Sequence, residues 1–202
     1  MRKPLLIAAA LLALTTTPAF PSGIELAWNH CFGQAGAVGV RTSACDVNTG
    51  NQLLVASFRP PAGPNVFIAV EAYVDYQVSG GVLPCWWDFS TGQLRQNQLV
   101  ILPVSPSDAN GDPAIACGNH YFRDHDGIGG GGMIVTGFDR GQLRGVAAIQ
   151  TGLAAPIPAE AQQYAIGFRI ANGSTVPGTT CPGCTQSTCM ILNGIKLEFM
   201  TP

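Results

Sequence analysis

The fold class is indicated most clearly by a stretch in which apolar residues alternate with other residues, Asn65-Val-Phe-Ile-Ala-Val-Glu-Ala-Tyr-Val-Asp-Tyr-Gln-Val-Ser79. Apolar residues occupy every second position, which predicts a β-strand with one buried face. The residues expected on the buried face are Val66, Ile68, Val70, Ala72, Val74, Tyr76 and Val78. Those expected on the opposite face are Glu71, Tyr73, Asp75 and Gln77.

The same alternation occurs in two further stretches. Between Gln163 and Ala171 the residues expected inside are Tyr164, Ile166, Phe168 and Ile170. Near the C-terminus Ile191, Ile195, Leu197 and Phe199 are expected inside, with Lys196 and Glu198 outside. Shorter strands are predicted at 24–29, 52–58, 99–104, 133–138 and 144–150, and turns at 60–64, 79–81, 110–113 and 127–132. Strands punctuated by turns, without helical crossovers, predict an all-β fold: a single antiparallel β-sandwich, jelly-roll or immunoglobulin-like, over residues 20–202.

The N-terminal residues predict an export signal. Arg2 and Lys3 precede an apolar run at 5–14, and Thr17-Pro18-Ala19 offers small residues for cleavage. The run is shorter than the roughly 20 residues that span a bilayer. We therefore expect residues 1–19 to be a signal peptide and the protein to be secreted and associated with the cell surface, without a membrane span.

The composition limits the partners. Charged residues make up 11% of the chain and the formal net charge is −2. Without a basic stripe, nucleic acid is not an expected partner. A weakly charged surface resists self-association poorly, which leaves assembly into a surface layer or filament open. A cell-surface polysaccharide is the other partner considered.

Seven cysteines predict that disulfides stabilise the fold, because thiols of exported proteins oxidise. They are Cys31, Cys45, Cys85, Cys117, Cys181, Cys184 and Cys189. We expect one bond between Cys31 and Cys45 and another between Cys85 and Cys117, although spacing alone does not determine connectivity. Within the C-terminal three, either two pair and one stays free, or the odd cysteine pairs with another chain.

A zinc site is the alternative for Cys181-Pro-Gly-Cys184, since Cys-x2-Cys pairs are common in such sites. No second Cys/His pair stands at a matching spacing, which favours the disulfide interpretation. A thioredoxin-like redox motif is disfavoured as well, because no βαβ pattern surrounds it.

Oxygen ligands gather between residues 107 and 126, which makes calcium the one cofactor to consider. The candidate ligands are Asp108, Asn110, Asp112, Asp124 and Asp126. The first three alternate as in an EF-hand loop, but Pro113 replaces its glycine and Asn119 its bidentate glutamate. Tight turns are the competing explanation for these residues. A transition-metal site at His120 and His125 is disfavoured, because the chain has only three histidines.

No catalytic residues are expected. Glu71 and Asp75 share a strand face four residues apart, about 13 Å at 3.3 Å per residue. Glycosidase carboxyl groups lie about 5 to 9.5 Å apart. No Gly-x-Ser-x-Gly elbow occurs, and His30, His120 and His125 each lack an obvious nucleophile partner in the local sequence, although a triad can assemble from distant segments.

Carbohydrate binding is a hypothesis centred on Trp86 and Trp87. Adjacent strand residues point to opposite faces, so at most one of these rings is expected outside, and core packing is the competing explanation for both. A sugar site would need that ring to lie beside Tyr73, Glu71 and Asp75 in a concavity.

Four segments together resemble a group of secreted bacterial β-rich proteins. They are Trp28-Asn29-His30-Cys31, the Pro-Pro-Ala-Gly turn at 60–63, Leu83-Pro-Cys-Trp-Trp87, and Cys181-Pro-Gly-Cys184 continued through Cys189 to Leu192-Asn193. The resemblance covers most of the chain after the signal. It implies export and a shared β-rich fold, and it implies no activity and no functional residues.

The chain departs from that group at one cysteine. The group has a Cys just before an Arg, where this chain has Leu94-Arg95, and Cys85 stands where the group has another residue. If residues 88–91 form a hairpin turn, positions 85 and 94 face each other across it. The resemblance therefore implies that the bond to Cys117 has moved across one strand pair.

Taken together, the sequence predicts an exported, non-catalytic β-sandwich that acts as a surface-associated binding or structural module. One alternative is a secreted carbohydrate-binding protein or hydrolase. Another is a self-assembling filament or surface-layer subunit.

Overall fold

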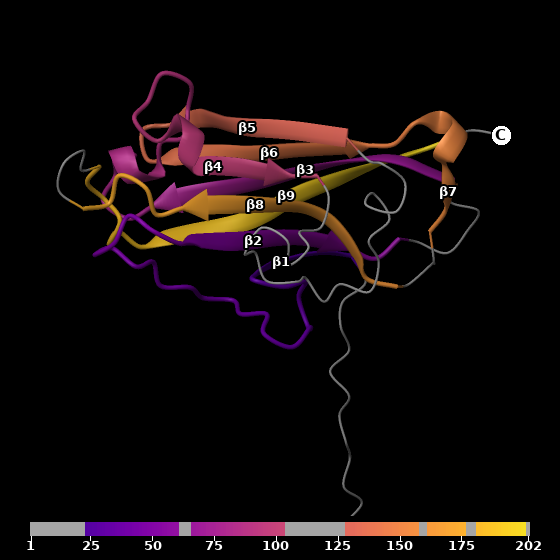
Figure 1. Cartoon of the computed structure of the whole chain (residues 1–202), viewed down its shortest axis with the longest axis horizontal. Coiled ribbons are helices and arrows are strands. Elements are labelled where there is room, and N and C mark those ends of the chain that lie inside the picture. Colours follow the sequence, from indigo (N-terminus) through magenta and orange to yellow (C-terminus); the bar gives the residue numbers. More distant parts are fainter. Residues whose placement is uncertain (1–22, 61–65, 104–127, 158–160, 177–180, 201–202) are drawn as a thin grey trace, which may run out of the picture.

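The computed structural model describes residues 23–60, 66–103, 128–157, 161–176 and 181–200, and two antiparallel β-sheets face each other in it (Figure 1). No α-helix occurs within these ranges. The expected all-β sandwich is confirmed.

The first sheet has four strands in the order β1-β2-β8-β4. Their bounds are Ile24–Trp28 for β1, Asn51–Phe58 for β2, Gln163–Ala171 for β8 and Leu99–Leu102 for β4. Six of the nine β8 residues form a continuous buried run, because this strand lies in the middle of the sheet and is covered on both faces.

The second sheet is built around β3, which pairs β6 on one side and β9 on the other. Its strands are β5 (Ile128–Gly137), β6 (Arg140–Ala148), β3 (Val66–Val78), β9 (Thr188–Phe199) and the two-residue β7 (Ala155–Pro156). At the margins of the sandwich β4 lies beside β5, and β1 lies beside β9. Three short 3₁₀ helices complete the described elements: η1 (Cys85–Trp87), η2 (Gln96–Gln98) and η4 (Thr151–Leu153).

A β-bulge in each alternating strand shifts which residues point inward. Ile68 is the extra residue on β3, so Phe67 turns inward at 1% exposure instead of Ile68. Asn193 is the extra residue on β9, so Ile191 lies outside at 62% exposure. A bulge adds one residue to a side-chain period of two and therefore reverses the faces beyond it. The inward placement predicted for Ile68 and Ile191 was wrong for this reason.

The bulge in β8 has the same effect on Tyr164. Ala165 is the extra residue, and it packs into the main core with Ile166, Phe168 and Ile170. Tyr164 instead joins a small cluster on the far face of the first sheet, with Cys31, Leu53 and Val55, and its hydroxyl donates a 2.7 Å hydrogen bond to the Leu102 carbonyl.

The glycine run before residue 133 belongs to a strand rather than to a turn. Residues 128–132 extend β5 along β6, where an added Cβ at Gly129 would overlap the carbonyl oxygen of Val146. Glycine therefore permits a close approach that any other residue would prevent. The turn predicted at 127–132 is wrong for the described residues 128–132.

Trp86 and Trp87 both lie in the core, at 0% and 5% exposure, so neither ring is available outside. The expectation of opposite faces assumed an extended strand, but these residues form the 3₁₀ helix η1, in which successive side chains diverge by about 120°. Trp86 donates through Nε1 to Thr175 Oγ1 at 3.0 Å. The Tyr76 hydroxyl donates to the Trp87 carbonyl at 2.6 Å, and burial raises the pKa of Tyr76.

Arg95 forms hydrogen bonds that connect the segment after η1 to the end of β8. It is fully buried, and its guanidinium donates to the carbonyls of Gly173 at 2.8 Å and Ala171 at 2.6 Å. Its Cζ atom lies 4.0 Å from the centroid of the Trp86 ring, a cation–π distance. Burial lowers the pKa of Arg95 to about 10, which still leaves a cation at neutral pH.

Replacing Arg95 should therefore destabilise the fold. We expect Arg95→Ala to lower the free energy of unfolding by about 3 kcal/mol, because two partly buried carbonyls lose a charged donor. Arg95→Lys should recover only part of that loss, since an ammonium cannot form the same planar fork. Urea denaturation measures both. The exposed Arg140→Ala is the control, with an expected change within about 0.5 kcal/mol, and an equal effect of the two alanine variants would contradict the assignment.

Candidate functional site

Two disulfides join three distant segments at one end of the sandwich. Cys45 bonds to Cys184 across 139 residues, and Cys85 bonds to Cys181 across 96 residues. The turn that contains Cys181 and Cys184 therefore fixes both the segment before β2 and the 3₁₀ helix η1. Gly183 in this turn has φ 109°, a left-handed conformation that favours glycine.

These bonds correct the expected connectivity. Cys45 pairs with Cys184 rather than Cys31, and Cys85 pairs with Cys181 rather than Cys117. Both observed bonds join cysteines far apart in the sequence, so the assumption that neighbouring cysteines pair was misleading. Cys31 is also disulfide-bonded, whereas Cys117 lies outside the described residues. The expected shift of a Cys117 bond to Cys85 is wrong as well.

The C-terminal three cysteines do not pair with one another. Cys181 and Cys184 each bond to a distant partner, which removes the zinc alternative, and Cys189 on β9 is a free, exposed thiol in the single chain. Two disulfides are typical of a protein that folds in an oxidising compartment.

The cross-linked end encloses a cavity of about 550 Å³, which we call the end pocket. It lies between β1, β2 and the beginning of β9. Its wall consists of Leu26, Ala27, Trp28, Gly39, Val40, Arg41, Thr42, Ser43, Cys45, Gln52, Leu54, Trp87, Cys184, Thr185, Gln186, Ser187, Thr188 and Met190. The volume lies within the range of small-molecule sites, roughly 300 to 1,000 Å³.

Hydrogen bonds fix the segment between β1 and β2, part of which lines the end pocket. Trp28 and Val38 exchange two backbone hydrogen bonds, of 2.9 and 3.2 Å, so the chain folds back along β1. Farther along, Gln52 on β2 donates through Nε2 to Ser43 Oγ at 2.7 Å. Together with the bond from Cys45 to Cys184, these contacts give the pocket its shape without a ligand.

Two buried polar atoms at the end pocket have no hydrogen-bond partner among the described residues. One is the indole Nε1 of Trp87, a donor, and the other is Oε1 of Gln186, an acceptor. A buried polar group without a partner costs about 1–3 kcal/mol, so natural folds keep few of them without a reason. Both atoms have almost no accessible surface, so they lie inside the protein rather than at the surface of the pocket.

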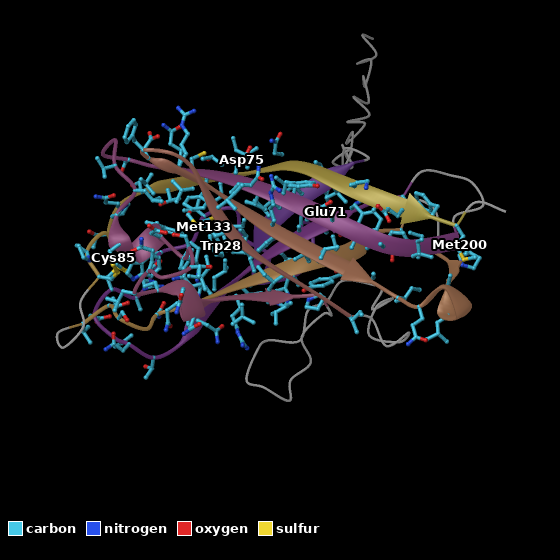
Figure 2. The ribbon with its side chains drawn as sticks, turned by 90° about the horizontal axis from the view of Figure 1, so that it is seen from above. Trp28, Glu71, Asp75, Cys85, Met133 and Met200 are labelled. Atoms are coloured by element: carbon cyan, nitrogen blue, oxygen red, sulfur yellow. A yellow bond between two sulfur atoms is a disulfide. The ribbon has the colours of Figure 1, made fainter. Side chains whose placement is uncertain are left out.

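The polar residues predicted at the surface lie elsewhere, on the outer face of the second sheet (Figure 2). Asp75 accepts hydrogen bonds from Gln142 at 2.6 Å and from Asn193 at 2.8 Å. Arg144 donates to Gln142 at 2.6 Å. Each oxygen of the Asp75 carboxylate therefore has a donor, and the carboxylate is fixed within a network between strands.

Tyr73 and Glu71 belong to the same outer face. A hydrogen bond to the Glu71 carboxylate raises the pKa of Tyr73, and Arg144 lies 5.3 Å from the centre of the Tyr73 ring. The proposed sugar site required these residues to meet Trp86 or Trp87 in a concavity. The structure separates them instead, because the tryptophans fill the core beneath the sheet.

The calcium candidates Asp108, Asn110, Asp112, Asp124 and Asp126 lie outside the described residues, as do His120 and His125. Within the described part of the chain, no group of three or more His, Cys, Asp or Glu side chains is placed to hold a metal ion. No helix in that part is both long and apolar enough to cross a bilayer.

Comparisons with known proteins returned no matching family model, no matching curated sequence and no matching solved structure. The functional argument therefore depends on the geometry of this chain.

Sequence reasoning missed the residues that form the end pocket, Trp28, Arg41, Gln52 and Gln186 among them. They come from β1, the segment before β2, β2 itself and the turn before β9, and no local pattern joins these. The one available signal was the number of cysteines, which indicated that distant segments are cross-linked without showing which ones.

The disulfide connectivity can be tested directly. Proteolysis without reductant, followed by mass spectrometry, should recover peptides joining Cys45 to Cys184 and Cys85 to Cys181, with Cys189 open to alkylation. A peptide joining Cys31 to Cys45 would contradict the arrangement. The double variant Cys45→Ser/Cys184→Ser should lose about 2–5 kcal/mol of stability, since a long loop is released in the unfolded chain.

Proposed function

We propose that the protein is an exported, non-catalytic β-sandwich that binds a small polar ligand, such as the end of a cell-surface polysaccharide, in the end pocket. The observation that carries this proposal is an open cavity of about 550 Å³ whose wall places the exposed Arg41 and several hydroxyl and amide groups beside the partly buried Leu26, Trp28 and Met190. Export is supported by the N-terminal sequence and by the two disulfides.

The chemistry of the pocket wall supports binding rather than catalysis. Among the described residues that form it there is no Asp, Glu, His or Lys. General acid–base and nucleophilic mechanisms both require a titratable group within hydrogen-bond reach of the substrate. Hydroxyl and amide groups beside apolar rings instead bind and orient a ligand, which is later released without chemical change.

A side chain added at the rim of the end pocket should block binding. Gly39 belongs to the wall, its φ is not positive, and an added Cβ there meets no atom within 4 Å. Gly39→Phe should therefore fold normally and lose affinity. Gly152 is equally open and lies on η4, away from the pocket, so Gly152→Phe is the matched control.

The measurement is a polysaccharide array, followed by titration calorimetry of each glycan that binds. Wild type and Gly152→Phe should bind the same glycans, and Gly39→Phe should bind them at least about tenfold more weakly. If no glycan binds, or if all three proteins bind alike, the proposal is wrong.

Self-association through the outer face is a second candidate, favoured by one row of side chains across the second sheet. Ile134, Gln142, Asp75 and Ile191 lie side by side in register, and the two isoleucines are 44% and 62% exposed. Light scattering should then show a concentration-dependent mass that Ile191→Lys abolishes. A monomer at every concentration in the wild type would rule this candidate out.

A further inference from the structure

We infer that the free edge of β9 is an interface where a second copy of this chain pairs antiparallel with the first, about a twofold axis through Leu197. This surface is separate from the end pocket, so the inference goes beyond the proposed function. β9 pairs with β3 on one side, and no other strand in the described part of the chain pairs with it. Figure 2 shows β9 along the margin of the second sheet, ending near Met200. An unpaired edge presents a row of backbone donors and acceptors that another strand can use.

The hydrogen bonds to β3 show which backbone groups of β9 are left at the edge. The Met200 N–H donates to the Val66 carbonyl at 2.8 Å, so it points towards β3. Backbone groups alternate between the two sides of a strand, so those of Lys196 and Glu198 also point towards β3. The residues whose N–H and C=O groups face the free edge are therefore Ile195, Leu197 and Phe199.

The charges on β9 select the register of the pair. Lys196 and Glu198 lie two residues apart on the outer face, with side chains 61% and 49% exposed. An axis through Leu197 places Lys196 opposite Glu198 of the second copy, and the reverse. These positions lie between hydrogen-bonded pairs, where side chains on neighbouring strands approach most closely. An axis through residue 196 or 198 would instead oppose two like charges, which is destabilising.

The ion pair within one chain is compatible with this arrangement. Lys196 Nζ lies 2.7 Å from Glu198 Oε1. An ammonium and a carboxylate each retain further hydrogen-bonding capacity, so each can also bond across the axis. Charge complementarity therefore favours a second copy of this chain as the occupant of the edge.

The inner face of β9 supplies apolar contact in the same register. Ile195, Leu197 and Phe199 pack against the core but are only partly buried. Leu197 would lie opposite its own copy, and Ile195 opposite Phe199 of the second copy. Continuing the sheet across the axis covers these side chains further, and the removal of apolar surface from water stabilises the pair.

Two features confine the pairing to residues 194–200. The bulge at Asn193 interrupts the regular edge. β1 lies beside the beginning of β9 at the end pocket, and its five residues are too few to extend along a strand of 12. Because both copies use the same edge, the pairing closes at a dimer and does not continue into a filament.

An exchange of charges tests the interface. The mass of the purified protein is followed against concentration by sedimentation equilibrium, with Cys189 alkylated so that no disulfide joins two chains. The wild type should show a monomer–dimer equilibrium. Lys196→Glu and Glu198→Lys should each weaken the dimer about tenfold or more, because each opposes like charges. The double variant Lys196→Glu/Glu198→Lys should return to within about threefold of the wild type, because its charges are again complementary.

Two controls separate the edge from the rest of the surface. Arg140→Glu makes the same change in net charge as Lys196→Glu at an exposed position on β6, and it should leave the dimer unchanged. Ile191→Lys alters the outer face before the bulge and should also leave it unchanged. Loss of the dimer in Ile191→Lys would assign association to the outer face and overturn the inference.

Amide hydrogen exchange locates the contact. At concentrations where the dimer forms, the N–H groups of Ile195, Leu197 and Phe199 should exchange more slowly than in the monomer, because they gain hydrogen bonds across the axis. Unchanged exchange at these residues in the dimer would overturn the strand pairing. A monomer at every concentration, or a double variant as weak as the single variants, would also overturn the inference. None of these results depends on whether a glycan binds in the end pocket.

Discussion

The arrangement of the end pocket depends on the double cross-link at the turn 181–184. Strand pairing and the burial of apolar side chains stabilise the two sheets, but neither interaction extends beyond the ends of the strands. Beyond that point Cys45 and Cys85 are brought to one turn across 139 and 96 residues of chain. Closing such long loops restricts the unfolded chain strongly. It also orders the pocket wall without a ligand, so the binding that we propose would not have to supply that ordering free energy.

The two polar regions of the molecule differ in whether their groups are satisfied. On the outer face of the second sheet, both oxygens of Asp75 accept hydrogen bonds and Lys196 forms a 2.7 Å ion pair with Glu198. At the end pocket, the exposed Arg41 makes no hydrogen bond or ion pair within the described part of the chain. A satisfied network stabilises the fold by itself, whereas an exposed polar group without a protein partner can bond to a ligand. The site that we propose therefore lies at the end pocket, where such a group lines a concavity.

Much of the fold was predictable from the sequence, because alternation reports which face of a strand is buried. The predicted strands fell close to β1, β2, β3, β4, β6, β8 and β9. Bulges at Ile68, Ala165 and Asn193 reversed the faces locally, and a bulge depends on how two strands pair, which one strand's sequence does not contain. The site was less predictable, since its residues are brought together by disulfides between distant segments. The fully buried Arg95 was missed for the same reason: its partners lie 76 and 78 residues away.

The central claim is that a ligand binds in the end pocket. Nuclear magnetic resonance observes each of the three tryptophan indole N–H groups separately. Trp28 lines the pocket and is only partly buried, so its signal should shift on titration with the ligand that calorimetry identifies. The Trp86 signal should stay in place, because that residue is fully buried and does not line the pocket. An unchanged Trp28 signal at saturating ligand would contradict the account.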